Sequence, residues 1–339
     1  MDSIVKAVSD TRVIITTVGP FEKYGSPVVE ACAKLGTHYV DITGETGWVQ
    51  TMLLRWEDHA QKTGAKIVSM CGFDCMPSDL TVMELEDMLP DGESLEKVVI
   101  VNDGEGSFSG GTIGTLLLSV EGNSRGPPKY SYDPYLKLPD GSKSATNTKI
   151  DLPTPTRKLD DTTGAFVGSY MGFIALSIAN ASNALRSNAL RGRSPGMVYQ
   201  EGILLPDWKS AFFVGWLHGF VAIMLTNPIT GYLLKRVLPK PGEGAALDDM
   251  LNKHFFAIYG YGYGSKGTKT RTALYYPHDA GYVDTARMLT ESAMSLAVDG
   301  DKLPSKDKGG FFTPSTGMGK VLLNRLIKSG IGFGKEIEK

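Results

Sequence analysis

The chain has 339 residues, 42% of them hydrophobic and 21% charged, so it is long enough for two domains with their own cores. Its 35 basic and 37 acidic residues leave a net charge of about −2. This balance argues against a nucleic-acid-binding protein, because such proteins depend on a basic surface.

The cysteines and histidines suggest neither a disulfide framework nor a metal site. Cys32, Cys71 and Cys75 are an odd set, which favours a reducing compartment, and Cys71 and Cys75 lack CxxC spacing. The five histidines are scattered, so we expect no metal. Met1 to Asp10 show no cationic segment followed by an apolar one, so we expect an intracellular protein without a secretory signal.

The first 95 residues follow a βαβαβ pattern. Short β-branched runs predict strands, while apolar residues at helical spacing predict helices. We expect Ser26 to be an N-cap, Gly36 to end that helix, and Pro77 to lie in an extended link. The predicted elements are strand Arg12–Val18, helix Ser26–Leu35, strand Thr37–Ile42, helix Gly47–Thr63, strand Lys66–Met70 and helix Ser78–Glu86.

A first strand with a Gly-rich phosphate loop has no counterpart in this pattern. A complete dinucleotide-binding fold places GxGxxG between its first strand and first helix, with an acidic residue about 20 positions later. Eleven residues precede the first predicted strand, and the glycines of 104–111 follow a different strand. The sequence therefore predicts half of such a domain, truncated at its N-terminus, with weak or no affinity for a dinucleotide.

The remainder of the chain changes character after Leu95. We expect residues 123–160, rich in Pro, Gly, Lys and Asp, to form an exposed excursion. The other expected elements are strand Glu96–Asn102, turn Ser109–Thr112, helix Ile113–Val120, helix Tyr282–Val298 and a last helix from Thr313 to about Gly330.

These elements predict an α/β fold: an incomplete Rossmann-like doubly wound parallel sheet plus an α+β substrate domain. We place the first domain at 1–95 and the substrate or dimerisation domain at 96–300. A C-terminal helix and tail at 301–339 is expected to pack back on the first domain.

A series of short motifs, in this order along the chain, resembles the saccharopine-dehydrogenase-like oxidoreductases, which include trans-acting enoyl reductases. The resemblance covers residue 12 onward and departs at the front, where the family has a strand and a Gly-rich loop. The motifs are Val18-Gly19-Pro20-Phe21, Tyr24-Gly25, Pro27-Val28-Val29, Ala31-Cys32, Tyr39-Val40-Asp41-Ile42-Thr43-Gly44-Glu45, Cys71-Gly72-Phe73-Asp74, Pro77-Ser78-Asp79-Leu80, Ser109-Gly110-Gly111-Thr112, Arg186-Ser187-Asn188-Ala189-Leu190, Gly281-Tyr282 and Gly309-Gly310-Phe311-Phe312-Thr313-Pro314.

The resemblance implies a cofactor, NADP or NAD, at two loops that follow predicted strands. In open α/β sheets ligands bind at the carboxyl ends of strands, although a plain strand-to-helix turn has the same form. Gly19 would let the backbone approach a flat ring, and Pro20 would stiffen the turn. The expected cofactor-binding residues are Val18, Gly19, Pro20, Phe21, Tyr24, Gly72, Phe73 and Asp74.

The sequence alone identifies no catalytic residue. Asp41, Thr43, Gly44 and Glu45 follow a strand, where the acids would bind ribose, orient a substrate or, for Glu45, stabilise the next helix.

Other side chains are candidates by type. Asp74 and Asp79 would act as acid or base if burial raised their pKa values, and Asp79 would equally stabilise its own helix. Tyr24 and His38 are proton donors by type. The cysteines are more simply packing residues than nucleophiles.

An uncharged apolar stretch, 210–234, has a length that would cross a bilayer, with Lys209 and Lys235 at its ends. A buried or re-entrant hairpin and a helix resting on a lipid surface are the alternatives. The uncharged residues 162–185 would pack beside it. Membrane, lipid-droplet or mitochondrial association follows as an expectation.

Two functions remain open on the sequence. The first is an NAD(P)-dependent oxidoreductase of lipid metabolism acting on a small, apolar, lipid-like substrate. The second is a non-catalytic membrane- or lipid-droplet-associated protein that has lost its cofactor site. A true saccharopine dehydrogenase is a weaker third, because no cluster of Arg and Lys suits an amino-dicarboxylate. The sequence does not indicate an oligomeric state.

Overall fold

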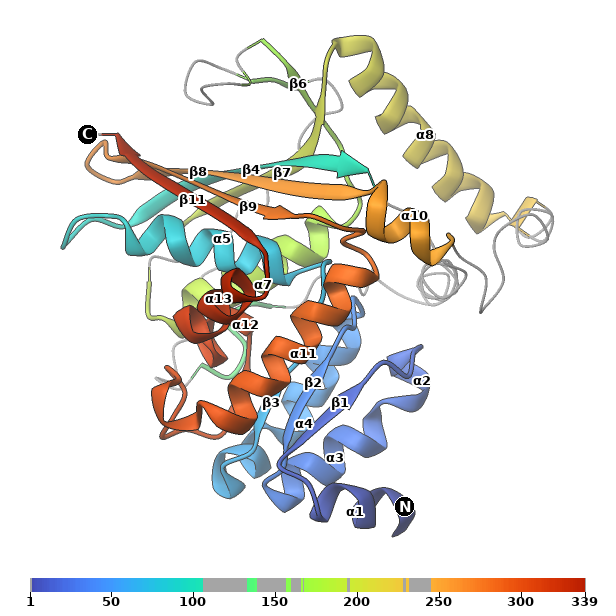
Figure 1. Ribbon diagram of the computed structural model, residues 1–339, viewed down its shortest axis with the longest axis vertical. Helices are drawn as coiled ribbons and strands as arrows, with labels where there is room; N and C mark the ends of the chain where they lie inside the picture. Colours follow the sequence, from blue (N-terminus) through green and yellow to red (C-terminus); the bar gives the residue numbers. More distant parts are fainter. Residues whose placement is uncertain are drawn as a thin grey trace.

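The computed structural model describes residues 2–105, 133–138, 157–159, 166, 168–193, 196–227, 230–231 and 245–338. The predicted turn at 109–112 and helix at 113–120 lie outside these residues, as does most of the expected excursion at 123–160. The fold contains two sheets, with sheet A in the lower part of Figure 1 and sheet B in the upper part.

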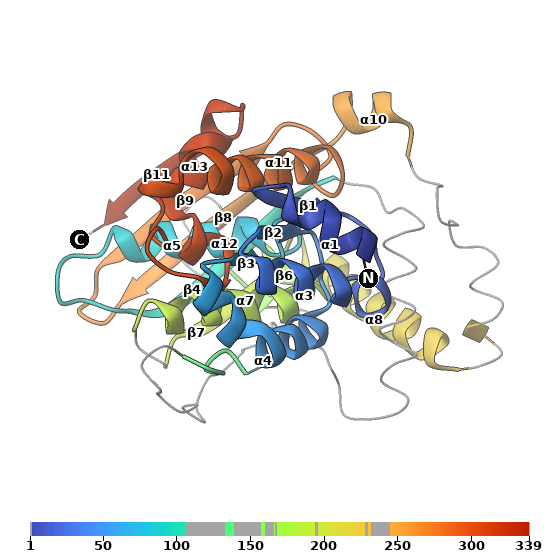
Figure 2. The same cartoon turned by 90° about the horizontal axis from the view of Figure 1, so that it is seen from below.

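Sheet A is parallel throughout and has the strand order β1-β2-β3-β10. Its first three strands confirm the βαβαβ pattern, and the short β-branched run Val13–Thr16 forms the first of them. Figure 2 shows these strands between α11 on one side and α3 and α4 on the other. The strands are β1 Val13–Thr16, β2 His38–Asp41, β3 Lys66–Val68 and β10 Gly310–Phe312.

Sheet B is mixed, with the order β11-β9-β8-β4-β7-β6-β5. Within it β4 and β7 are parallel, and the other neighbours are antiparallel. The predicted α/β class, a Rossmann-like parallel sheet with a second unit, is confirmed. The strands are β4 Leu95–Glu105, β5 Arg157–Lys158, β6 Tyr170–Gly172, β7 Val198–Leu205, β8 Phe255–Gly264, β9 Lys269–Tyr276 and β11 Gly332–Glu338.

The helices of sheet A have clear local signals. Gly36 and Gly64 end α3 and α4 with φ of 80°, a left-handed conformation that favours glycine. These helices are α1 Asp2–Ser9, α2 Phe21–Tyr24, α3 Ser26–Leu35, α4 Thr46–Thr63 and α11 Val283–Val298.

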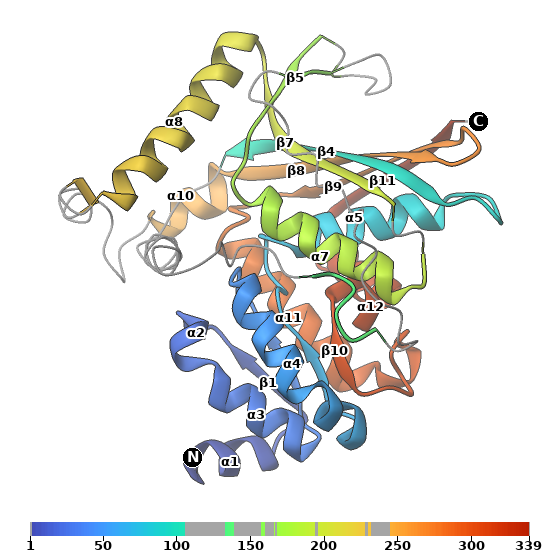
Figure 3. The ribbon, with the colours of Figure 1, turned by 180° about the vertical axis from the view of Figure 1, so that it is seen from behind.

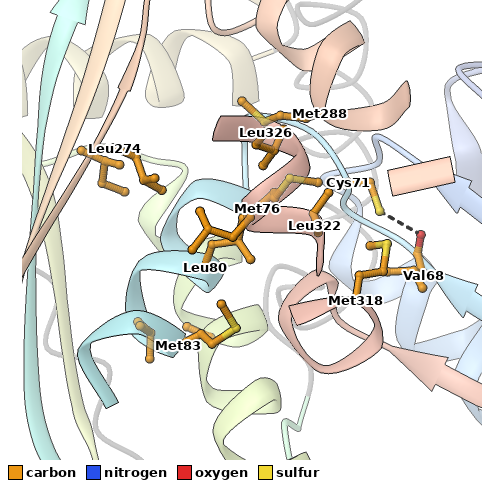
Figure 4. Packing of buried hydrophobic residues seen from close by; sticks show 14 of the residues in the cluster. Val68, Cys71, Met76, Leu80, Met83, Leu274, Met288, Met318, Leu322 and Leu326 are labelled. Carbon is orange, nitrogen blue, oxygen red and sulfur yellow. Dashed lines mark hydrogen bonds between the residues drawn. The ribbon is translucent and has the colours of Figure 1, made fainter. Parts of the chain in front are cut away.

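Helix α5 (Met76–Asp87) lies under sheet B and is buried along almost its whole length. It packs on β8 and β9 on one side and contacts α7 (Ser177–Leu190), α12 (Pro314–Gly317) and α13 (Gly319–Lys328) on the others. Figure 3 shows α7 beside it from behind. Figure 4 shows the core that results, in which side chains of α5 meet those of α11, α13 and β9.

Three local predictions are wrong. Ser26 is the first residue of α3 rather than its cap, and its Oγ accepts a hydrogen bond from Trp48 Nε1 (3.0 Å). Pro77 lies inside the first turn of α5, where a residue without an N–H costs no hydrogen bond. The last predicted helix is two helices, α12 and α13, with Met318 between them.

Helix α8 (Trp208–Thr226) accounts for most of the apolar stretch 210–234 and stands out beside sheet B in Figure 1. It packs on β6 and β7, so part of the 162–185 segment does lie beside it, whereas α7 from the same segment packs on α5. The short helix α10 (Leu247–Asn252) follows in the chain. Within the described ranges, no helix combines the length and apolar character needed to cross a membrane.

Candidate functional site

Three loops meet at the carboxyl edge of sheet A, because its strands are parallel neighbours. The first follows β1 and carries Val18 to Tyr24, the second follows β2 and carries Ile42 to Glu45, and the third follows β3 and carries Gly72 to Asp74. This is the edge at which open α/β sheets bind ligands.

Glu45 of the second loop holds the backbone of the first loop in place. The Glu45 carboxylate accepts hydrogen bonds from the backbone N–H groups of Phe21 (2.8 Å) and Glu22 (2.7 Å), the first turn of α2. The sequence suggested that Glu45 stabilises the N-terminus of the next helix, α4. Its carboxylate instead stabilises the N-terminus of α2.

The expected cofactor residues of the first loop divide into a buried and an open group. The Phe21 ring is buried in the core against Trp48, with ring centroids 5.6 Å apart. Val18 and Tyr24 are 62% and 49% exposed. Gly19 has open space where a side chain would stand, since an added Cβ would meet only the Phe21 ring, at 3.6 Å. The loop thus presents backbone at Gly19, with Val18 and Tyr24 beside it.

Asp41 ties the second loop to the third. Its Oδ1 accepts from the backbone N–H groups of Thr43 and Met70, both at 3.0 Å, and its Oδ2 accepts from Ser69 Oγ at 3.0 Å. Burial raises the pKa of this carboxyl to about 6, although the three hydrogen bonds oppose the shift. These internal partners make Asp41 a positioning residue of the edge.

The third loop reaches toward sheet B. Gly72 fits between Ile42 and Thr285, whose Cγ2 atoms would each lie 3.2 Å from an added Cβ. The Phe73 N–H donates to Thr285 Oγ1 (3.0 Å), and the Phe73 ring meets Phe256 of β8 edge-on, with centroids 4.5 Å apart. Phe73 therefore connects the edge of sheet A with the second sheet.

Asp74 differs from Asp41 because no hydrogen bond from the described part of the chain opposes the effect of burial on the pKa of its carboxyl. Its Oδ2 lies 3.3 Å from the Cβ position of Gly44, so it faces the second loop. Burial raises the pKa of its carboxyl to about 6. A carboxyl with that pKa can hold or release a proton near neutral pH.

Asp79, the other acid considered, is bound inside the protein. Its Oδ2 accepts from the Ser315 backbone N–H (2.7 Å), and its Oδ1 accepts from Ser315 Oγ (2.9 Å) and from Ser187 Oγ. It is 1% exposed, and it joins α5, α7 and α12. Ser187 Oγ also contacts Thr313 Oγ1 (2.6 Å), so three of the motifs that carry the resemblance meet at this buried junction.

The remaining candidates by residue type are not available for chemistry at the edge, although Cys71 and Cys75 flank its third loop. Cys32, Cys71 and Cys75 are buried, and burial raises the pKa of each thiol, for Cys32 to about 12. They therefore remain thiols and serve as packing residues. His38 lies at the amino end of β2, where its Nδ1 accepts the Lys66 N–H (3.1 Å), and burial lowers its pKa to about 4.

Below the Phe73 loop lies a pocket that the sequence did not indicate. Its free volume is about 10 Å³, room for roughly one water molecule. We call it the Glu201 pocket, after the carboxylate at its polar end. The sequence contains no sign of it, because no regular spacing along the chain relates Glu201 to Asn102 or Asn180. Its lining residues are Phe73, Pro77, Ser78, Asn102, Ile174, Leu176, Asn180, Glu201, Phe256 and Ile258.

A Rossmann-like α/β protein is the class that this fold and edge define. Among the described residues, no three His, Cys, Asp or Glu side chains gather as metal ligands. No family model matches the chain.

Curated relatives match over almost the whole chain. "Putative trans-acting enoyl reductase Rv2449c" from Mycobacterium tuberculosis is 34% identical over 337 residues, which cover 95% of this chain and 79% of the relative. The "Trans-acting enoyl reductase" of Mycobacterium ulcerans is 32% identical over 94% of this chain and 79% of that protein. That of Mycobacterium bovis is 31% identical, with 95% and 80% covered.

A solved structure of saccharopine dehydrogenase (L-Glu forming) from Saccharomyces cerevisiae has the same fold, with a TM-score of 0.50 and 14% identity over all of this chain and 87% of that one. The chain belongs to the family of the trans-acting enoyl reductases, and it has the fold of saccharopine dehydrogenase.

Proposed function

We propose that this protein is an NAD(P)-dependent oxidoreductase that reduces a carbon–carbon double bond in a lipid-like substrate. The observation that carries the proposal is the edge of sheet A, where the open backbone of Gly19 is on the first loop and the Asp74 carboxyl, whose pKa is raised to about 6, is on the third, with the second loop between them. The names of the curated relatives supply the reaction type.

The first loop supports a place for the nicotinamide end of the cofactor. Within 4 Å of a Cβ added at Gly19 lie only atoms of the Phe21 ring, so a flat ring would be able to approach this backbone, with the exposed Val18 and Tyr24 beside it. Such a reduction needs a hydride, which the cofactor supplies when bound, and a proton, which Asp74 is suited to hold. Glu45 keeps the Gly19 loop in place through its two backbone hydrogen bonds.

The lining of the Glu201 pocket is one reason to propose an apolar substrate rather than an amino-dicarboxylate. Among the described residues it combines Phe, Ile, Leu and Pro side chains with amides and one carboxylate, without Arg or Lys. A substrate with several carboxylates would require such cations.

Cofactor binding tests the proposal directly. NADPH and NADH are titrated to millimolar concentration, because the sequence predicts weak affinity, and binding is followed by tryptophan fluorescence and by saturation-transfer NMR of the nicotinamide protons. Gly19→Val fills the open space without a clash inside the protein and should weaken binding at least tenfold. Gly300→Val, at another open glycine far along the chain, is the matched control and should bind as the native protein does.

Two results would count against the proposal. Absence of binding by the native chain at millimolar cofactor would overturn the oxidoreductase assignment. Equal binding by native protein and Gly19→Val would remove the cofactor from this edge.

A second candidate function is attachment to a lipid surface, with or without catalysis. Helix α8 exposes Trp208, Phe212, Phe213, Trp216, Leu217, Phe220 and Ile223, each more than 40% exposed. At 100° per residue they occupy about half of the helix circumference, and the helix is about 28 Å long. An aromatic apolar face of this kind is typical of helices that rest in a lipid interface.

Vesicle binding tests this second candidate. Neutral phosphatidylcholine vesicles should shift the tryptophan emission to the blue and sediment the protein. Phe212→Ser with Phe220→Ser should abolish sedimentation, whereas Leu35→Ser with Leu54→Ser, at two exposed leucines on other helices, should not. Sedimentation that is equal in both double variants would rule out α8 as the lipid contact.

A further inference from the structure

The third loop of the edge is held from α11 by a hydroxyl group. Thr285 Oγ1 accepts the Phe73 backbone N–H (3.0 Å) and donates its own hydrogen to the Ala280 carbonyl oxygen (2.8 Å). A threonine hydroxyl has one hydrogen and two lone pairs, so it makes both bonds at once. Because Thr285 is 7% exposed, water competes little for either of them.

The methyl group of the same side chain also contacts the loop. Thr285 Cγ2 would lie 3.2 Å from a Cβ added at Gly72, so the methyl packs against the bare backbone of this glycine. Thr285 therefore contacts two consecutive residues, Gly72 and Phe73, and the next residue along the loop is Asp74.

The turn that precedes α11 is fixed by two buried carboxylates. Asp279 Oδ1 accepts the N–H of Tyr282 (3.0 Å), which belongs to one of the motifs that carry the resemblance. Asp284 Oδ2 accepts the N–H of His278 (3.1 Å), and both acids have 0% exposure. The carbonyl oxygen that orients the Thr285 hydroxyl is part of this turn, so the hydroxyl has a fixed acceptor.

Asp74 depends on the loop backbone for its position. Among the described residues, no hydrogen bond or ion pair involves its carboxylate, which faces the second loop with Oδ2 3.3 Å from a Cβ added at Gly44. Asp41, by contrast, is held by three hydrogen bonds to its own carboxylate. What holds the backbone of the third loop therefore also holds the Asp74 carboxyl.

We propose that Thr285 is a positioning residue for Asp74: its hydroxyl fixes the backbone at Phe73 and so keeps the Asp74 carboxyl facing the second loop. Helix α11 thereby acts on the edge through a residue 212 positions along the chain from the loop that it holds. The inference rests on the proposed function for the role of Asp74 in proton transfer, but the positioning itself is tested without cofactor.

The experiment follows the titration of Asp74 in the whole protein by carboxyl-carbon NMR with labelled aspartate, and Asp74→Asn assigns its signal. Thr285→Val keeps the branched shape and removes the hydroxyl, so the Phe73 N–H loses its acceptor and the loop opens to water. We expect the pKa of Asp74 to fall from about 6 to below about 5 as the carboxyl becomes hydrated. The Phe73 amide should exchange with solvent at least about tenfold faster.

Two variants separate the hydroxyl from other effects of substitution. Thr285→Ser keeps the hydroxyl and should keep the native pKa of Asp74. Thr290→Val is the matched control, because Thr290 lies on the same helix and its Oγ1 donates within that helix, to the Ala286 carbonyl oxygen (2.8 Å). It should leave the titration of Asp74 and the exchange of the Phe73 amide unchanged.

Amide spectra verify that each variant is folded, and Thr285→Ala, which also removes the hydroxyl, replaces the valine variant if that one is unfolded and should give the same fall. An Asp74 pKa that is equal in the native protein and Thr285→Val, or that falls as far in Thr285→Ser or Thr290→Val, would overturn the inference. So would a native pKa near the ordinary 3.8, because the loop would then not keep this carboxyl from water. These measurements contain no cofactor, so their failure leaves NADPH binding untouched, and absence of NADPH binding leaves the Thr285 result intact.

Discussion

Gly25 joins α2 to α3 at a position where two opposing effects of a single methyl group can be compared. Its φ of −78° and ψ of −31° are helical, so alanine would gain about 0.4–1 kcal/mol by restricting the unfolded chain. The added Cβ, however, would lie 2.7 Å from Trp48 Cζ2 and 3.0 Å from the Phe21 carbonyl oxygen. Overpacking of this kind costs about 1–3 kcal/mol.

The overpacking term should win, because Trp48 cannot easily move. Its Nε1 donates to Ser26 Oγ, and its ring packs against Phe21. We therefore expect Gly25→Ala to lower the free energy of unfolding by about 1–2 kcal/mol. In a Trp48→Phe background, which removes the crowding indole atoms but keeps the Phe21 carbonyl oxygen, the same substitution should cost about 1 kcal/mol less than in the native protein.

Urea denaturation of the four proteins in this double-mutant cycle measures the coupling. Gly219→Ala is the matched control: Gly219 lies within α8 with open space around its Cβ position, so alanine there should leave stability unchanged or raise it. An equal cost of Gly25→Ala in both backgrounds, or stabilisation in the native background, would refute the packing argument.

Three further predictions concern substitutions of Asp79, Asp74 and Glu45. Asp79→Asn should lower the free energy of unfolding by about 2–3 kcal/mol in urea, because an amide N–H would face the donors of Ser187 and Ser315; a loss below about 0.5 kcal/mol would contradict it. The folded pKa of Asp74, about 6, exceeds its ordinary 3.8, so the native protein should lose stability relative to Asp74→Asn as pH rises from about 4 to 6; parallel pH curves would show that the shift is absent. Glu45→Ala should cost about 1–2 kcal/mol by freeing two backbone N–H groups, and Glu45→Gln less, as urea midpoints would report; equal losses would argue against the capping role.

The elements with strong local signals were predictable from the sequence. Helix Ser26–Leu35 matches α3 at both ends, because Pro27 and Gly36 restrict its backbone, and the helix expected at 282–298 is α11 within one residue. The first three strands of sheet A were likewise placed correctly, since short β-branched runs between glycine turns have few alternatives, whereas its fourth strand, β10, was missed. The edge at which their loops meet followed from the parallel order alone.

The polar clusters were not predictable, because they depend on contacts between distant residues. Glu201 and Asn102 lie on neighbouring strands, β7 and β4, and Asn180 reaches them from α7. Strands β8 and β9 were missed as well, although the glycine-containing turn at 264–267 between them is a hairpin signal. The domain bounds at 95 and 300 and the roles of the cofactor residues stay predictions.

The final thirty residues complete both sheets. Strand β10 adds to sheet A beside β3, and β11 adds to sheet B beside β9. During synthesis, neither sheet can acquire its last strand until this segment has left the ribosome, so the two parts of the molecule should reach their native state together rather than in turn. Because β10 pairs with β3 across a long stretch of sequence, we expect slow folding. The stability of both sheets should also depend on this one short segment.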